Sequence, residues 1–328
     1  SNGKACGVVV RDLLNDKEYT VKAKAVINAA GIFVDEVMQM DEPNMPKMVV
    51  PSQGVHIVLD MKFLQSDYAI MVPKTSDGRV LFAVPWHGRV VVGTTDIVRE
   101  TPEMEPRPLE EEIDFILNTA SLYMNPAPTR KDILSVFAGQ RPLAAPKKEG
   151  KSSKEVSRSH KIIVSDHDLI TITGGKWTSY RRMAEDTVDK AIEMGKVEKR
   201  KCATRKLKVH GWRPNPNLAD HMYVYGSDEP SIRKMINENP ALGERLSEKF
   251  GYTVAEVLWA VRKEMAQTVE DVLARRVRML FVDAREAKRV APRVAQLMAA
   301  ELGKDEQWID DQTRAFESLA DRYIFQPK

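Results

Sequence analysis

The start of the chain alternates short apolar runs with turn-forming residues, a pattern typical of β-strands. Two such runs, residues 6–11 and 19–23, flank Asn15-Asp16 and predict a β-hairpin. A short apolar strand at 25–28 ends in Ala29-Ala30-Gly31, after which apolar residues recur at helical spacing. The chain is therefore predicted to open with a hairpin, followed by a strand, a turn of small residues and a helix.

Between residues 49 and 93 apolar and polar positions alternate as in an antiparallel sheet. Strands are expected at 54–59, 68–72, 80–84 and 90–93, with bends at Asp77-Gly78 and His87-Gly88. A helix over about 109–123 is ended by Asn125-Pro126-Ala127-Pro128, and strands at 161–165 and 169–173 lead through Gly174-Gly175-Lys176 into a helix to about 194. This part is mixed α and β.

Beyond residue 208 the spacing of Leu, Val, Met and Trp becomes helical. Thr253 and Glu256 have the spacing of a capping box, in which each side chain accepts a hydrogen bond from a backbone amide of the first turn. Pro292 is expected to kink or split its helix. The helices are expected at 231–238, 241–250, 253–264, 268–276, 283–302 and 305–322. These patterns predict an α+β protein with an all-α C-terminal domain at residues 205–328.

The composition is that of a globular protein with room for about two domains, since 43% of its 328 residues are hydrophobic and 30% charged. A net charge of +3 does not indicate a nucleic-acid surface. Cys6 and Cys202 are too few for a disulfide framework or a structural zinc site, so a reducing compartment and no metal are expected. No apolar run approaches the roughly 20 residues that span a bilayer, so any membrane contact is expected to be peripheral.

Two turns of small residues are candidates for close approach to a cofactor. Ala29-Ala30-Gly31 and Gly174-Gly175 each follow a strand and precede a helix, where small side chains leave room for a ligand or for a packed backbone. Gly174-Gly175 also has Lys176 beside it, so it favours an anion through exposed backbone amides. Ordinary packing of strand against helix is the alternative at both turns.

Three further positions have side chains suited to chemistry. His56 lies in a strand, where it is either structural or available for proton transfer. Arg141 precedes a proline that favours an extended backbone, so its guanidinium is suited to a carboxylate or phosphate, or to an ordinary ion pair. Asp96 follows Thr94-Thr95 after a strand, as in a turn or a helix cap. The basic runs 147–161 and 196–208 fit either an anionic lipid surface or a solvated loop.

Taken together in order, five segments resemble the membrane-associated, FAD-dependent glycerol-3-phosphate dehydrogenases of the D-amino-acid-oxidase-like flavoprotein superfamily. The segments are Val26-Ile27-Asn28-Ala29-Ala30-Gly31, Ser52-Gln53-Gly54-Val55-His56, Val92-Gly93-Thr94-Thr95-Asp96, Gly139-Gln140-Arg141-Pro142-Leu143 and Gly174-Gly175-Lys176-Trp177-Thr178-Ser179-Tyr180. The resemblance covers nearly the whole chain and includes Glu264-Met265-Ala266 and Val272-Leu273-Ala274-Arg275-Arg276 in the C-terminal helices.

The resemblance implies a catalytic region at 1–204, in which partial FAD-binding parts at about 1–50 and 168–204 are interleaved with a substrate-binding sheet at about 51–167. The family holds the FAD pyrophosphate with an N-terminal Gly-x-Gly-x-x-Gly, which this sequence does not contain. An N-terminal arginine that the family uses beside the flavin is also missing. The chain starts at Ser1 without an initiator methionine, so we expect a truncated or processed chain that is inactive alone and lacks FAD, the cofactor of the parent enzyme. The cofactor-binding residues carried over are Ala30, Gly31, Gly174, Gly175 and Thr178.

Four side chains become candidates for the substrate pocket through the resemblance. His56 is expected to take the hydroxyl proton, and Arg141 with Arg158 to neutralise the phosphate. Lys176, near the expected flavin, is expected to stabilise either the developing oxyanion or the reduced flavin.

The implied parent enzyme oxidises sn-glycerol 3-phosphate to dihydroxyacetone phosphate and passes electrons from FAD to a quinone. We expect a cytoplasmic protein, peripheral on the inner face of the cell membrane, that does not bind nucleic acid and whose oligomeric state is open. Another FAD-dependent oxidoreductase, acting on an amino acid or a hydroxy acid, is one alternative. A non-catalytic module that functions through its C-terminal helices is the other.

Overall fold

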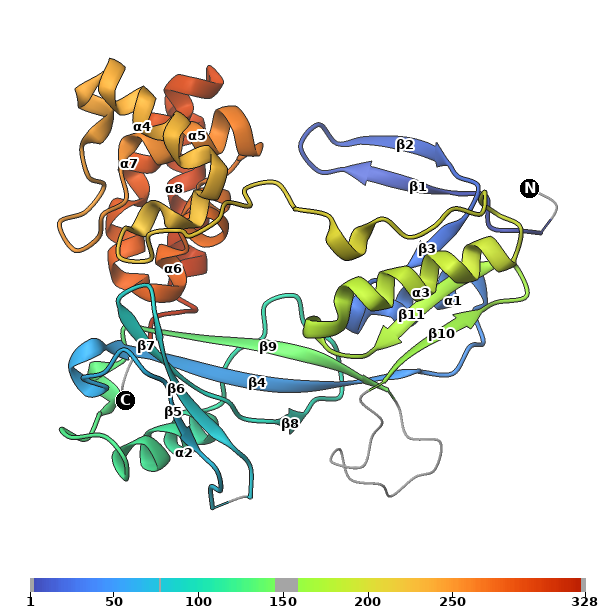
Figure 1. The fold of residues 1–328 in the computed structure, drawn as a ribbon, viewed down its shortest axis with the longest axis horizontal. Coiled ribbons are helices and arrows are strands. Elements are labelled where there is room, and N and C mark those ends of the chain that lie inside the picture. The colour runs from blue at the N-terminus through green and yellow to red at the C-terminus, as the bar shows by residue number, and fades with distance from the viewer. Residues whose placement is uncertain (1–2, 77, 145–158, 326–328) are drawn as a thin grey trace. The chain divides into compact units, whose positions relative to one another are not determined.

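The computed structural model describes residues 3–76, 78–144 and 159–325. Its strands are β1 Gly7–Asp12, β2 Lys17–Lys22, β3 Val26–Asn28, β4 Val49–Asp60, β5 Ile70–Val72, β6 Leu81–Trp86, β7 Arg89–Gly93, β8 Ile97–Val98, β9 Ser135–Ala144, β10 His160–Val164 and β11 Leu169–Gly174. Its α-helices are α1 Val34–Asp41, α2 Glu110–Ser121, α3 Tyr180–Glu193, α4 Glu229–Glu238, α5 Val254–Glu264, α6 Met279–Val282, α7 Ala284–Leu302 and α8 Glu306–Ala320. The chain forms two compact units (Figure 1).

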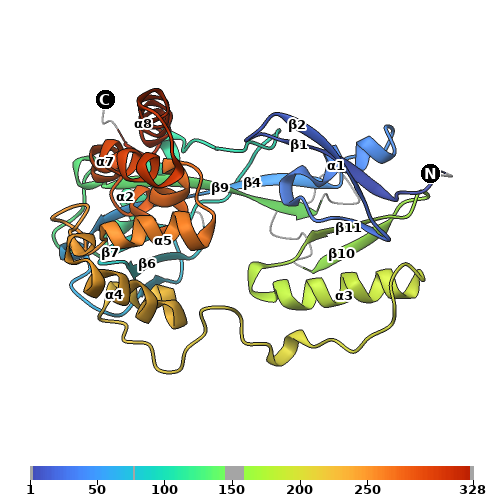
Figure 2. The same ribbon diagram turned by 90° about the horizontal axis from the view of Figure 1, so that it is seen from above.

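The first unit comprises Ser1–Gly54, Asp96–Pro106 and Gly139–Leu207. The predicted hairpin is present as the antiparallel pair β1–β2. A separate sheet has the order β10-β11-β3, in which β11 runs antiparallel to β10 and parallel to β3. Figure 2 shows α3 on one side of β10 and β11 and α1 on the other. Because β3 and β11 are parallel neighbours, the two turns of small residues that follow them lie at the same edge of this sheet.

The second unit comprises Val55–Thr95, Arg107–Ala138 and Lys208–Lys328. Its antiparallel strands β5, β6, β7 and β4 lie in that order, and β9 also pairs with β4. Alternate residues of β4, Val55, Ile57 and Leu59, are fully buried and share one hydrophobic core with Ile113 and Ile116 of α2. Val58 on the other face is fully buried as well, so the alternation in the sequence marks the face that packs with α2 but not a solvent-exposed face of β4.

The helical part of the second unit has its own large core, formed mainly by α5, α6, α7, α8 and a π-helical turn at Asp271–Arg276. The capping box at the start of α5 is confirmed, because Thr253 N donates to Glu256 Oε2 at 2.7 Å. Pro292 does not split its helix, because α7 continues through the proline. Val290, Ala291 and Val294 around it are buried.

The helix predicted at 241–250 is wrong. A short 3₁₀ turn at Pro240–Gly243 follows Asn239, whose side chain accepts a hydrogen bond from Ala241 N. The chain then turns back on itself through an isolated antiparallel bridge between Arg245 and Thr253, and Leu246 N donates to Tyr252 O at 2.9 Å. Leu246 and Tyr252 are buried because the loop folds back on itself, and not because they lie on one face of a helix.

The expected α+β class with a C-terminal helical region is confirmed. The chain re-enters the second unit at Lys208, close to the expected boundary near 205, but its helices share that unit with the sheet of β4–β7. Independent folding of residues 205–328 stays a prediction. Among the described residues, no helix combines the length and apolar character needed to cross a membrane.

Candidate active site

The first turn of small residues is fixed by the buried side chain of Asn28. Its Nδ2 donates to Val34 O at 2.9 Å and to Thr171 Oγ1 at 3.3 Å, while its Oδ1 accepts a hydrogen bond from Ala30 N. Asn28 thereby joins β3, β11 and the start of α1. The backbone of Ala30 and Gly31 is held in a defined position at the edge of the sheet.

The glycines at this edge have different physical roles. Gly31, Gly174 and Gly175 all have positive φ, where other side chains are strained. A Cβ on Gly175 would lie 2.7 Å from Met183 Sδ, so Gly175 is also required for packing of α3 against the strand. A Cβ on Gly31 would meet nothing within 4 Å, so the space in front of that turn is open. The packing interpretation holds for Gly175 and leaves Gly31 available for contact with a ligand.

One buried hydroxyl at the same edge lacks a hydrogen-bond partner. Thr173 Oγ1 is covered from solvent, and the described part of the structure supplies no partner for it. An open turn at Gly31 next to a buried, unsatisfied polar atom fits a large cofactor that brings its own polar groups. Of the predicted residues, Ala30 and Gly31 would line such a group, whereas Gly174 and Gly175 pack against Ser159 and Met183 and stay predictions as cofactor ligands. Thr178 belongs to the turn Trp177–Ser179 and is exposed.

Lys176 lies at the start of that turn and its side chain is exposed. The next residue, Trp177, is 84% exposed and stacks on Tyr180 with ring centroids 5.2 Å apart. Lys176 is therefore accessible to a ligand at this end of the sheet. Its role as a catalytic residue stays a prediction.

Arg141 on β9 forms an ion pair, which was one of its two expected uses, with a partner that was not predicted from the sequence. Its Nη1 lies 3.5 Å from Asp96 Oδ1, and Ser52 Oγ hydrogen-bonds to the same oxygen. The guanidinium is 40% exposed, so it remains accessible to a further anion. Arg158, the other predicted phosphate ligand, lies outside the described residues.

His56 belongs to the second unit, where β4 places it opposite Gly93 of β7. A Cβ at Gly93 would come within 2.4 Å of His56 Cδ2, so the imidazole occupies the space of a missing side chain. On β9, Phe137 stacks on the imidazole at a centroid distance of 5.3 Å. His56 is only partly buried, so the structure presents a histidine with restricted orientation and an accessible side.

The strand next to His56 is anchored by Thr95. Val55 N donates to Thr95 Oγ1 at 2.9 Å, and Thr95 Oγ1 donates to Glu112 Oε1 at 2.6 Å. The second oxygen of Glu112 accepts a hydrogen bond from Leu109 N at the start of α2. Thr95 is thus tied to a helix cap, whereas its neighbour Asp96 pairs with Arg141 in the first unit.

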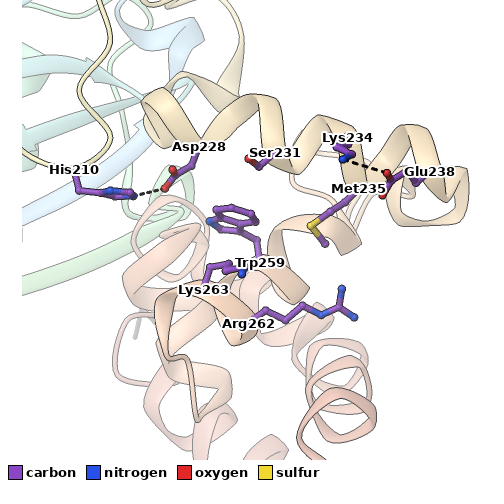
Figure 3. Close-up of a pocket in the computed structure, with 9 residues that line it drawn as sticks. All are labelled: His210, Asp228, Ser231, Lys234, Met235, Glu238, Trp259, Arg262 and Lys263. Atoms are coloured by element: carbon purple, nitrogen blue, oxygen red, sulfur yellow. Dashed lines mark hydrogen bonds and ion pairs between the residues drawn. The ribbon is translucent and has the colours of Figure 1, made fainter.

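Two other groups of polar side chains were not predicted from the sequence. A hollow of about 590 Å³ in the helical part has Trp259 and Met235 among its lining residues (Figure 3). Its charged residues include the ion pairs His210–Asp228 at 2.7 Å and Lys234–Glu238 at 3.6 Å. In the first unit, ligand atoms of Asp41, Glu42 and His167 lie within 4.8 Å of one another. His167 Nδ1 and Asp41 Oδ1 form an ion pair at 3.2 Å, which accounts for the closeness of these two side chains.

Comparison with known proteins gives two family matches. Residues 4–181 match the family described as FAD dependent oxidoreductase, and residues 168–309 match the C-terminal domain of alpha-glycerophosphate oxidase. The second match begins one residue before β11 and includes most of the helical region.

Relatives with similar sequences are named glycerol-3-phosphate dehydrogenases. A probable mitochondrial one from Dictyostelium discoideum is 38% identical over 89% of this chain and 49% of its own length. The mitochondrial one from Arabidopsis thaliana is 37% identical over 90% of this chain and 51% of its own length. The chain therefore spans about half the length of these curated relatives.

A solved structure matches along the whole chain. The glycerol-3-phosphate dehydrogenase from Bacillus halodurans complexed with FAD has a TM-score of 0.82 and 29% identity, and the match covers 100% of this chain and 68% of that one. Since the oxidoreductase family matches residues 4–181, more than half of the chain, this chain belongs to the family of FAD-dependent oxidoreductases.

Proposed function

We propose that the chain is the substrate-facing and C-terminal part of a glycerol-3-phosphate dehydrogenase that oxidises sn-glycerol 3-phosphate to dihydroxyacetone phosphate. The observation that carries the proposal is the match over the entire chain to the structure of the Bacillus halodurans glycerol-3-phosphate dehydrogenase complexed with FAD. The names of the curated relatives support the same activity.

The proposed reaction assigns separate tasks to the described residues. The turn at Ala30 and Gly31 would hold FAD, which would supply the acceptor for a hydride from the alcohol carbon. His56 accepts the hydroxyl proton, a task suited to an imidazole whose orientation is restricted by Gly93 and Phe137. Lys176 stabilises negative charge that develops on the substrate oxygen or on the reduced flavin.

Arg141 is proposed to bind the phosphate, and its ion pair with Asp96 affects the charge that the phosphate meets. Asp96 offsets much of the positive charge of Arg141 at 3.5 Å, so the pair alone is close to neutral. A phosphate dianion therefore needs further positive charge, which we assign to Arg158. The ion pair with Asp96 would restrict the orientations of the guanidinium and so reduce the entropy lost when the phosphate binds.

Quinone as the electron acceptor and peripheral association with the inner face of the cell membrane are also proposed. Their support is the family resemblance and the basic run at 196–208, which suits an anionic lipid surface. Arg200 within this run is 80% exposed and pairs with Glu198, so part of its charge is already offset. Vesicle sedimentation with and without anionic lipid would show whether that surface binds.

The activity is tested with the polypeptide encoded by the whole reading frame that contains this sequence. The purified protein is assayed with an artificial electron acceptor against glycerol 3-phosphate, glycerol, amino acids and 2-hydroxy acids. Turnover of glycerol 3-phosphate well above the other substrates supports the proposal. Preferred turnover of an amino acid or a hydroxy acid establishes the alternative oxidoreductase instead, and absence of flavin and of all turnover favours a non-catalytic module.

A further inference from the structure

The imidazole of His56 is the first of four aromatic rings in contact within the second unit. It stacks on Phe137 at 5.3 Å with the planes 18° apart. Phe137 meets Phe281 edge to face at 5.3 Å, and Phe281 meets Tyr323 in the same way at 5.5 Å. Phe281 lies in α6 and Tyr323 follows α8. This ring series therefore connects a strand histidine to the helical C-terminal region.

The strand that carries Phe137 is held by residues of the same helical region. The buried Ser135 Oγ donates to the carbonyl oxygen of Leu280 at 2.9 Å, and Leu280 is the residue before Phe281. Val136, the residue before Phe137, donates its backbone N–H to Tyr323 O at 2.9 Å. The two hydrogen bonds hold β9 next to the segments that carry Phe281 and Tyr323. The position of Phe137 is thus set by the helices as well as by the sheet.

A second constraint on the His56 ring, besides the stacking on Phe137, comes from β7. The imidazole fills the space beside Gly93, where a Cβ would lie 2.4 Å from Cδ2. An imidazole confined by Gly93 and stacked on Phe137 has few rotamers open to it. A shift of Phe137 would therefore be transmitted to the direction in which the ring nitrogens of His56 point.

We propose that Phe281 is a positioning residue for His56, acting through Phe137, so that the C-terminal helices determine the orientation of the proton acceptor. The kinetic consequence rests on the proposed function, whereas the orientation of the imidazole does not depend on any substrate. Edge-to-face and stacked rings have preferred geometries, so removing one ring changes where its neighbour lies. A displacement of a reacting group by about 1 Å can lower turnover by on the order of a hundredfold.

The orientation is tested by NMR on the 328-residue chain labelled with ¹³C-histidine. The protein has six histidines, and His56→Gln identifies the His56 resonance. Phe281→Leu, which removes the ring but keeps an apolar side chain, should shift that resonance, and Phe137→Leu should shift it further. Phe316→Leu is the matched control, because Phe316 is buried in the same helical core outside the ring series.

Kinetics of the whole protein provide a second readout. Phe281→Leu should lower kcat for glycerol 3-phosphate by on the order of tenfold or more while KM changes little, since an interaction that acts on the base is used in the transition state. If Phe281→Leu does not fold, Phe281→Met fills more of the volume and carries the same expectation.

An unchanged His56 resonance in the Phe281 variant, or an equal change in Phe316→Leu, overturns the proposal. So does a shifted resonance with unchanged kcat in an enzyme that turns over glycerol 3-phosphate. If the enzyme does not use that substrate, the proposed function is wrong, and the resonance of His56 still decides whether Phe281 positions it.

Discussion

Asp96 Oδ1 lies 3.5 Å from Arg141 Nη1, so the cation that we assign to the substrate phosphate is already paired with a carboxylate. The pairing explains how a partly exposed guanidinium keeps one direction without a ligand. It also means that the phosphate must compete with, or add to, an existing ionic contact. The contribution of Arg141 is therefore best measured by substitutions that separate its charge from its geometry.

Substitution of Arg141 should selectively weaken the use of glycerol 3-phosphate. Arg141→Ala should lower kcat/KM by the equivalent of about 2 kcal/mol or more, the scale for a charged hydrogen-bond partner. Arg141→Lys keeps the charge but loses the planar fork, so an appreciable decrease is also expected. Steady-state kinetics on the whole protein measure both, with unphosphorylated glycerol as the control substrate. Equal losses for the two substrates would mean that Arg141 acts on the fold or on the flavin.

Gly93→Ala should destabilise the protein and displace His56. The new methyl group would lie 2.4 Å from His56 Cδ2 and 2.7 Å from Val55 O, so either the ring or the strand must move. Overpacking of this kind costs about 1–3 kcal/mol. Urea unfolding measures the cost, and Gly139→Ala serves as the stability control because a Cβ there meets nothing within 4 Å. Equal stability of the two variants would show that His56 has room to adjust.

Acid should weaken the helical region through Glu286. Hydrogen bonds from Arg289 and Ser247 lower the pKa of this buried carboxylate to about 2 from an ordinary value of 4.5, although burial opposes the shift. Because the folded-state pKa is depressed, the stabilisation is present above pH 4.5 and is lost as the pH falls from 4.5 toward 2.

Urea unfolding followed by circular dichroism at pH 7 and at several values between 5 and 3 tests this pH dependence. Glu286→Gln should be less stable than the wild type at pH 7, by about 2 kcal/mol, and should lose less stability on acidification. The exposed Glu306→Gln is the control. Parallel acid profiles for the wild type and Glu286→Gln would contradict the role of this carboxylate.

Residues 205–328 alone should form helices and unfold cooperatively. Their core is extensive, with Val269, Val272 and Val294 fully buried among many others. Trp86 of β6 also packs against this core, so the isolated fragment should be less stable than the intact chain. Circular dichroism and thermal melting of the fragment test the prediction. Little helical signal, or a melt without a transition, would show that the sheet is required for the helices to fold.

Local signals in the sequence predicted most elements but few of the contacts at the site. The capping box of Thr253, the alternation of Val55, Ile57 and Leu59, and the hairpin β1–β2 all depend on neighbours in sequence, and the structure contains them. The prediction of a helix at 241–250 was wrong because a buried loop that turns back on itself leaves apolar residues at spacings that imitate a helix.

Pairings between distant segments had no local signal. The parallel pairing of Thr171 with Asn28 brings both turns of small residues to one edge, yet nothing in either segment specifies the other. The same holds for Arg141 with Asp96, since a guanidinium shows no preference for one carboxylate until the strands are paired. The resemblance to a family selected the candidate residues, and the fold supplied their partners.

Anaerobic reduction of the bound flavin tests the central claim most directly. The whole protein that contains this chain, purified with FAD, is mixed with glycerol 3-phosphate in the absence of any acceptor while the flavin absorbance is recorded. We predict that one equivalent of glycerol 3-phosphate bleaches the flavin and yields dihydroxyacetone phosphate, and that glycerol does so poorly. A protein that holds stoichiometric FAD and stays oxidised with glycerol 3-phosphate, while an amino acid or a hydroxy acid bleaches it, would contradict the assignment.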